Sequence, residues 1–301
     1  MQVNDILAII ICFHPDHRRL RDLISNISWN VSKIILFDNG GVNPAELIDV
    51  ADKVKIESRG RNVGLGEALN FACDAGVRGG YRFVVSFDQD SSPPREMIDL
   101  LRRELLVYQD KDARAIAIGP QLIDRRNDHE EVMPFICFNG FKALKWSGEG
   151  TRPVSHLITS GCMIDVSCWG TVDRFLDDLF IDYVDNNWSW RAGRRGYVLL
   201  GTSLAKMPHE LSEGIEQIGA FSTNKYSPLR RYFQMRNSAY HLFHERLTLA
   251  QRLYVLRSMA VTFVSAMISD PSSLRSLSQC IRGLGHGLVG RLGPWKKTHG
   301  D

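Results

Sequence analysis

The sequence has no apolar run long enough to cross a bilayer. Its longest runs are Ile6–Phe13 and Ala260–Ile268, and both are far shorter than the roughly 20 residues of a membrane-spanning helix. The N-terminal stretch MQVND also lacks the basic residues that begin a signal peptide. These absences predict a cytoplasmic protein.

Paired cysteines are missing as well. The 301 residues include 6 cysteines, but none of them form a C-x-x-C pair and none lie in a histidine-rich stretch. Structural zinc sites are usually built from such pairs. We therefore expect reduced, mostly buried thiols that pack as small apolar side chains.

Two familiar nucleotide motifs are absent. The stretch Gly60–Gly66 (GRNVGLG) precedes a predicted helix, but no Gly-Lys-Ser or Gly-Lys-Thr follows it. Its glycines also miss the G-x-G-x-x-G register of dinucleotide-binding folds. Kinase and dehydrogenase chemistry are therefore disfavoured, whereas binding of an anion by Arg61 and the backbone N–H groups at this helix start stays open.

Acidic residues are scarce in the last quarter of the chain. Residues 226–301 carry 11 Lys and Arg against 3 Asp and Glu, a balance of +8, which leaves −5 for residues 1–225 within the total of +3. A basic tail on a mildly acidic body indicates an anionic surface as a partner.

The first half of the sequence alternates short apolar runs with helical patterns. The runs 5–13, 34–37, 54–57 and 81–87 are rich in β-branched residues, and helical spacing of apolar residues separates them. Such alternation predicts an α/β fold with a mainly parallel sheet. Ligands of these sheets bind at the carboxyl ends of the strands, where the loops converge.

Four polar residues follow predicted strands directly: His14, Asp38, Asp88 and Asp90. Each has a purely structural alternative, since His14 could belong to a helix start and Asp38 to a turn. The pair Asp88 and Asp90 in SFDQDSS forms a D-x-D pattern. Two carboxylates at a strand end could approach a divalent cation that also holds a diphosphate.

A second acidic motif is FIDYVD. Asp182 and Asp185 are three residues apart and would share one face of a helix over about 182–195. Either carboxylate could accept a proton from an attacking hydroxyl. The alternative is a solvated first turn, where acidic residues favour the helix dipole.

The C-terminal region has two helical patterns. Leu249, Leu253, Leu256, Ala260, Phe263 and Met267 form one helix face, and a second pattern over 274–292 contains four glycines and three arginines. Glycines weaken a helix in water, so this second helix either orders on a bilayer or packs on the body. The sequence predicts a domain over 1–225 and a basic helical region over 226–301.

The ordered motifs resemble the family 2 inverting glycosyltransferases, and among them bacterial rhamnosyltransferases of polysaccharide and O-antigen assembly. The resemblance covers roughly residues 5–240. It is carried by the Ile9–Phe13 strand, FDNG (37–40), RNVG (61–64) with Asn70, FDQDS (87–91), TSG (159–161), FIDYVD (180–185), His209 and the stretch 230–237.

This resemblance implies a GT-A fold and a nucleotide-sugar donor, with dTDP-L-rhamnose expected and Mg²⁺ or Mn²⁺ as cofactor. It implies that Asp185 is the catalytic base and that Asp88, Asp90 and His209 bind the metal. The implied donor-binding residues are Phe13, His14, Pro15, Asp38, Arg61, Asn62, Gly64, Asn70, Asp88, Gln89, Ser160, Gly161 and Arg236. Among these, Asp38 is expected at the base and Arg236 at the diphosphate.

The expected function is therefore transfer of L-rhamnose, with inversion, to a lipid-linked saccharide in cell-surface polysaccharide synthesis. The protein is expected at the inner face of the cytoplasmic membrane, with its C-terminal region on anionic lipid. Two alternatives remain: a transferase of the same fold that uses a UDP-hexose, and a nucleotide-sugar-binding protein without transfer activity.

Overall fold

The computed structural model describes residues 5–124, 131–209, 215–218, 221–224, 226–268 and 273–295. The chain forms two units. The first comprises Met1–Cys137, Lys145–Leu176 and Asp185–His209, and the second comprises Phe138–Leu144, Asp177–Val184 and Glu210–Asp301. The second unit therefore takes in two short earlier segments, and its last part begins at Glu210, before the boundary predicted at residue 225.

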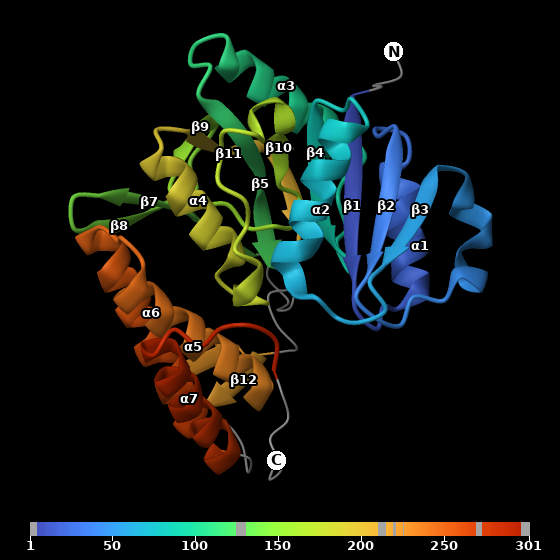
Figure 1. Ribbon diagram of the computed structural model, residues 1–301. Coiled ribbons are helices and arrows are strands. Elements are labelled where there is room, and N and C mark those ends of the chain that lie inside the picture. The colour runs from blue at the N-terminus through green and yellow to red at the C-terminus, as the bar shows by residue number, and fades with distance from the viewer. Residues whose placement is uncertain are drawn as a thin grey trace. The chain divides into compact units, whose positions relative to one another are not determined.

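The first unit is built on a mainly parallel sheet, as predicted (Figure 1). Its parallel strands are β1 (Ile6–Cys12), β2 (Lys33–Asp38), β3 (Val54–Ser58), β4 (Phe83–Asp88), β5 (Ala115–Asp124) and β11 (Val198–Pro208). The antiparallel strands are β6 (Glu131–Val132), β9 (Thr151–Val154) and β10 (Met163–Asp165). The strand order is β3-β2-β1-β4-β10-β5-β11-β9, with β6 beside β5.

Helices cover both faces of this sheet because its strands are apolar on both sides. On one face, α1 (His17–Ile27) and α3 (Met97–Gln109) pack on alternate strand residues such as Ile6, Ala8 and Ile10. On the other face lies α2 (Gly64–Arg78), where a Cβ added to Gly76 would lie 2.6 Å from the Val84 side chain. Between β2 and β3, residues Pro44–Lys53 form a 3₁₀ helix.

The chain also contains shorter strands and helices outside this sheet. β7 (Phe135–Asn139) and β8 (Lys142–Trp146) pair with each other, as do β12 (Ile215–Ile218) and β13 (Phe221–Asn224). Short 3₁₀ helices occupy Val166–Cys168 and Asp177–Leu179, and α4 (Val184–Arg194) follows them. All 6 cysteines are free thiols and most are buried, as predicted.

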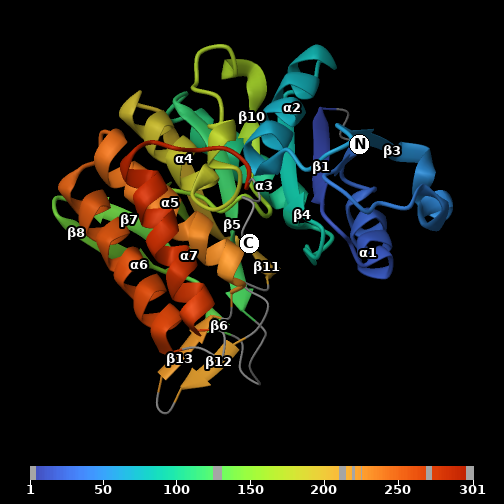
Figure 2. The same cartoon turned by 60° about the horizontal axis from the view of Figure 1, so that its bottom comes forward.

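In the second unit, α5 (Pro228–His244), α6 (Leu249–Ile268) and α7 (Ser273–Leu288) lie side by side (Figure 2). The glycines of α7 allow it to pack closely on α5. A Cβ added to Gly283 would lie 2.4 Å from the Tyr232 carbonyl oxygen, and one added to Gly287 would lie 2.2 Å from the Arg236 carbonyl oxygen. The glycines are thus explained by close helix packing. Over the described ranges, no helix combines the length and apolarity that crossing a membrane requires.

Candidate active site

The carboxyl ends of β1, β2, β3 and β4 bring the first group of predicted residues together. Cys12 is level with Asp38, Asp38 with Ser58, and Ile11 with Asp88 in the parallel registers. The residues that follow these positions therefore share one edge of the sheet.

Backbone and side-chain hydrogen bonds join these loops. The Gln89 amide bonds both backbone groups of Phe13: the Phe13 N–H donates to Oε1 at 2.7 Å, and Nε2 donates to the Phe13 carbonyl at 3.1 Å. The His14 N–H donates to the Gly40 carbonyl at 2.7 Å. Gln89 is therefore a positioning residue that fixes the loop beside Asp88 and Asp90.

The first loop presents rings to the edge of the sheet. Phe13 is exposed, and its ring packs edge-on against that of His14 with ring centres 4.4 Å apart. His14 has a φ of 50°, which only a minority of non-glycine residues adopt. Pro15, the next residue, is buried. Phe13, His14 and Pro15, three of the predicted donor-binding residues, thus form one continuous loop.

Asp38 supports the loop that follows β2. Its Oδ1 accepts hydrogen bonds from the N–H groups of Gly40 at 2.7 Å and Val42 at 3.3 Å. Its other carboxylate oxygen is not used in this turn. Asp38 therefore has the structural role that the sequence left open, together with an oxygen that a ligand could reach.

Asn39 is a residue that sequence reasoning missed. It is buried, its Oδ1 accepts from the Val63 N–H at 3.0 Å, and its Nδ2 donates to the Gly64 carbonyl at 3.2 Å. It ties the end of β2 to the start of α2. The only available signal was its place in FDNG, where it could be taken for a turn residue.

The loop before α2 contains Arg61 and the backbone N–H groups that the sequence predicts to bind an anion. Asn62 Oδ1 accepts from the Gly64 N–H at 2.9 Å, and Gly64 has a φ of +85°, which favours glycine. Arg61 is exposed and makes no ion pair with any part of the chain that the structure describes. Arg61 is thus available to an anion, whereas Asn62 shapes the loop.

The Asn70 side chain bonds the backbone of another segment. It is buried, its Nδ2 donates to the Phe175 carbonyl and its Oδ1 accepts from the Phe175 N–H, both at 2.9 Å. The amide satisfies the backbone of a neighbouring segment because buried polar groups require partners. In this structure the Asn70 amide thus supports the Phe175 backbone, and a donor contact of Asn70 stays a prediction.

Hydrogen bonds connect the D-x-D loop to the TSG motif. Ser91 and Ser160 are buried, with their hydroxyl oxygens 2.7 Å apart. The Gly161 N–H donates to the Ser86 carbonyl at 2.7 Å. Gly161 has a φ of +76°, and a Cβ there would lie 2.8 Å from the Pro120 ring, so only glycine fits this turn.

Asp185 lies on the same network, in the first turn of α4. Its Oδ2 accepts from the Thr159 N–H at 3.3 Å, and its Oδ1 accepts from the Asn186 N–H at 2.8 Å. Burial and then the nearby charge of Asp185 raise the pKa of Cys162 to about 12, so this thiol stays protonated. The half-buried Asp185 carboxylate borders a small pocket together with Ser86, Thr159 and Cys162.

Asp182, the alternative base, lies in the second unit and is enclosed. Burial raises the pKa of its carboxyl group, whereas Arg230 acts in the opposite direction. Arg230 Nη2 is 3.4 Å from Asp182 Oδ1, and the Asn237 amide donates to the carbonyls of Leu179, Ile181 and Asp182. Asp182 is thus part of a tightly held turn.

The Arg236 guanidinium bonds other parts of the chain. It is buried in the second unit, where Nη1 donates to the Gly293 carbonyl at 2.5 Å and Nη2 donates to the Leu179 carbonyl at 2.8 Å. Its Nε donates to Asn237 Oδ1 at 2.9 Å. All three guanidinium nitrogens thus hold neighbouring chain segments, and the expected diphosphate contact stays a prediction.

The predicted metal ligands are only partly brought together. Asp88 ends β4, and the exposed Asp90 follows in the same loop. His209 follows β11, which lies three positions from β4 in the strand order of the sheet. Across the described ranges, no three His, Cys, Asp or Glu side chains gather as a metal site. A metal site made of Asp88, Asp90 and His209 therefore stays a prediction.

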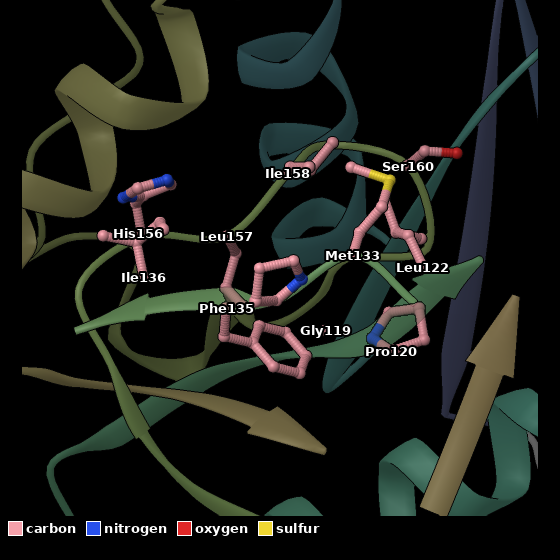
Figure 3. Close-up of a pocket in the computed structure, with 11 residues that line it drawn as sticks. Gly119, Pro120, Leu122, Met133, Phe135, Ile136, His156, Leu157, Ile158 and Ser160 are labelled. Atoms are coloured by element: carbon pink, nitrogen blue, oxygen red, sulfur yellow. The ribbon is translucent and has the colours of Figure 1, made fainter. Parts of the chain in front are cut away.

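A further pocket lies beside Ser160 in the first unit. Figure 3 shows its mainly apolar wall, with His156 and Ser160 at opposite ends. Gly119 and Gly201 make room for this wall, because a Cβ at either position would lie within 3 Å of Leu157 or Phe135 respectively. The His156 ring also packs edge-on against Trp190.

We expect the buried His156 to make the stability of the fold sensitive to acid. Burial lowers its pKa to about 4 from the usual 6.5, so below pH 6.5 the unfolded chain takes up a proton that the folded chain does not. Stability should fall by up to about 3 kcal/mol between pH 6.5 and 4 and be independent of this group above pH 6.5. Urea unfolding at several pH values would measure this. His156→Gln should remove this part of the slope, whereas His244→Gln, at an exposed position, should keep it.

Known proteins resemble this chain in sequence and in fold. No family model matches it. The dTDP-rhamnosyl transferase RfbF of Shigella flexneri is 29% identical over 239 residues, which are 78% of this chain and 79% of the relative.

The structural matches are more distant in sequence. GalNAc-T7, solved with UDP, GalNAc and Mn²⁺, superposes with a TM-score of 0.57 at 12% identity over 96% of this chain, which spans 57% of the GalNAc-T7 chain. S. aureus TarS 1–349 in complex with UDP-GlcNAc matches with a TM-score of 0.51 at 13% identity, over 95% of this chain and 91% of TarS 1–349. Together the comparisons support a glycosyltransferase, and they confirm both the predicted GT-A fold and the predicted resemblance to rhamnosyltransferases.

Proposed function

We propose that this chain transfers L-rhamnose from dTDP-L-rhamnose to a saccharide acceptor, with inversion at the anomeric carbon. The observation that carries this proposal is the similarity to a dTDP-rhamnosyl transferase over 78% of the chain. The hydrogen-bonded connection between the D-x-D loop and Asp185 supports a transferase site, because it links an acidic strand end to a candidate base.

The nucleotide occupies the edge formed by β1, β2 and β4. Asp38 contacts the base with the carboxylate oxygen that its turn leaves unused. Phe13, His14 and Pro15 border the base, and Arg61 with the N–H groups near Gly64 faces the phosphates. Asn62, Gln89, Ser160 and Gly161 shape this site rather than provide its charge.

Two aspartates suit a divalent cation at this edge. The exposed Asp90 carboxylate accepts no hydrogen bond from the described residues, and Asp88 stands at the strand end beside it. Mg²⁺ typically uses one or two protein carboxylates and takes its other ligands from phosphates and water. Mg²⁺ or Mn²⁺ bound there would neutralise charge on the departing diphosphate.

Asp185 is the base of the proposed reaction. The N–H groups of Thr159 and Asn186 hold one carboxylate oxygen each, so the carboxylate is fixed in direction. It accepts the proton of the acceptor hydroxyl while that oxygen attacks the anomeric carbon and the dTDP group leaves from the opposite side. Single displacement of this kind inverts the anomeric configuration.

The acceptor in this proposal is a lipid-linked saccharide, as in cell-surface polysaccharide or O-antigen synthesis. The protein then works at the inner face of the cytoplasmic membrane. The excess of basic residues in the C-terminal region supports this placement.

Donor hydrolysis tests the proposal. The purified protein should slowly release dTDP from dTDP-L-rhamnose in the presence of Mg²⁺ or Mn²⁺, and EDTA should reduce this release by at least tenfold because the diphosphate then leaves without charge neutralisation. UDP-glucose, UDP-galactose and UDP-GlcNAc serve as controls.

Preferential turnover of a UDP-sugar would leave the fold assignment intact and replace the rhamnose donor. If no donor is hydrolysed, calorimetric titration with each donor identifies which nucleotide sugar the protein binds. Equal release with EDTA would contradict the metal-dependent mechanism.

A further inference from the structure

The outward face of α6 is apolar over its whole length. Six residues on this face have exposed fractions between 36% and 59%: Leu249, Leu253, Leu256, Phe263, Val264 and Met267. Five of them belong to the helix face that the spacing predicts, and Val264 lies beside it. The opposite face, with Val255, Ser265 and Ala266, is buried in the second unit. A stripe of this size normally covers a core, so its exposure requires a partner.

The charged side chains of α6 are all positive. Arg252 and Arg257 are its only charged residues, and both are exposed. At 3.6 residues per turn they fall on opposite edges of the apolar stripe. Arg252 Nη1 donates to the Leu242 carbonyl at 3.0 Å, and Arg257 makes no ion pair with the described parts of the chain. The stripe is therefore bordered by positive charge on both sides.

These features select one occupant. We propose that α6 is the membrane-docking surface of the protein, with its stripe in the acyl boundary and its two arginines at the phosphates of anionic lipid. A helix lying in the interface needs an apolar face with basic flanks, and long arginine side chains reach the headgroups from its edges. A second copy fits less well, because a two-fold contact through α6 would bring arginines together without carboxylates.

In this proposal α6, and not α7, is the part of the C-terminal region that contacts lipid. The sequence points to the glycine-rich helix, but α7 uses Ser276, Cys280, Gly283 and Gly287 to pack within the second unit. Removal of α7 would disturb α5 and would not be a clean test. The inference deepens the membrane placement in the proposed function, and lipid binding can be measured without turnover.

The test is vesicle co-sedimentation of the full chain. Vesicles of mixed phosphatidylglycerol and phosphatidylcholine should bind the protein. The triple variant Leu253→Gln, Leu256→Gln, Met267→Gln should bind at least about tenfold more weakly, because each change removes apolar area from the interface. The matched control Ile48→Gln, Val77→Gln, Leu204→Gln replaces three similarly exposed apolar residues of the first unit and should bind as the unchanged protein does.

A second variant tests the charge. Arg252→Gln with Arg257→Gln should weaken binding to the anionic vesicles by about thirtyfold, from about 1 kcal/mol per cation, and change binding to pure phosphatidylcholine little. Unchanged vesicle binding by the triple variant would overturn the inference. So would a dimer, detected by sedimentation velocity, that the triple variant dissociates, because it would make a second copy the occupant of the stripe. dTDP-L-rhamnose hydrolysis should be the same in all these variants, which separates this inference from the proposed function.

Discussion

Asp185→Asn should reduce transfer by about a hundredfold to ten-thousandfold, the range typical of a general base, while the donor still binds. Asparagine has nearly the same shape and keeps one oxygen to accept a hydrogen bond from Thr159 or Asn186. It cannot take the proton of the acceptor hydroxyl. Transfer rates and calorimetric donor affinity of both proteins would measure the two effects separately.

The matched variant is Asp182→Asn, three residues earlier. Asp182 is enclosed and paired with Arg230, so its loss leaves a cation without its partner and should lower stability. Full transfer by Asp185→Asn, together with loss of transfer in a stably folded Asp182→Asn, would show that Asp182 is the base.

Gly287→Ala should destabilise the second unit by about 1–3 kcal/mol or more, the typical cost of overpacking. The new Cβ would lie 2.2 Å from the Arg236 carbonyl oxygen and 2.7 Å from the Ala239 Cβ, so α5 and α7 must move apart. The better helix propensity of alanine, about 1 kcal/mol, is too small to offset this clash. Urea unfolding followed by circular dichroism would measure the change.

Gly285→Ala is the control in the same helix. Nothing lies within 4 Å of a Cβ at this position, so the substitution should be neutral or stabilise by up to about 1 kcal/mol. Equal stabilisation by both variants would indicate that the glycines act through helix propensity alone and not through contact with α5.

The sequence predicts structure best where that structure depends on residues close together in the chain. Apolar runs alternating with helical spacing predict the parallel sheet, and the polar residues that end those runs predict its ligand edge, because parallel strands all end at one edge. Asp38, Asp88 and Asp90 are found there for this reason. The same reasoning predicts α6 but not which of its faces is covered, because periodicity does not identify the packing partner.

Residues with distant partners could not be assigned in this way. Asn70 bonds Phe175, and Arg236 bonds residues 178, 179 and 293. No local pattern shows that an amide or a guanidinium in a motif satisfies backbone far away in the chain. His209 follows a strand as predicted, but the strand order separates it from Asp88.

The turn before α4 is held by hydrogen bonds from residues that come much later in the sequence. Arg236 and Asn237 hold the carbonyls of residues 178–182, and the Gly293 N–H donates to the Asp178 carbonyl at 2.7 Å. During synthesis these partners emerge long after the turn itself, and contacts between distant residues form slowly. The segment that leads into Asp185 can therefore make all of these hydrogen bonds only after residue 293 has been synthesised.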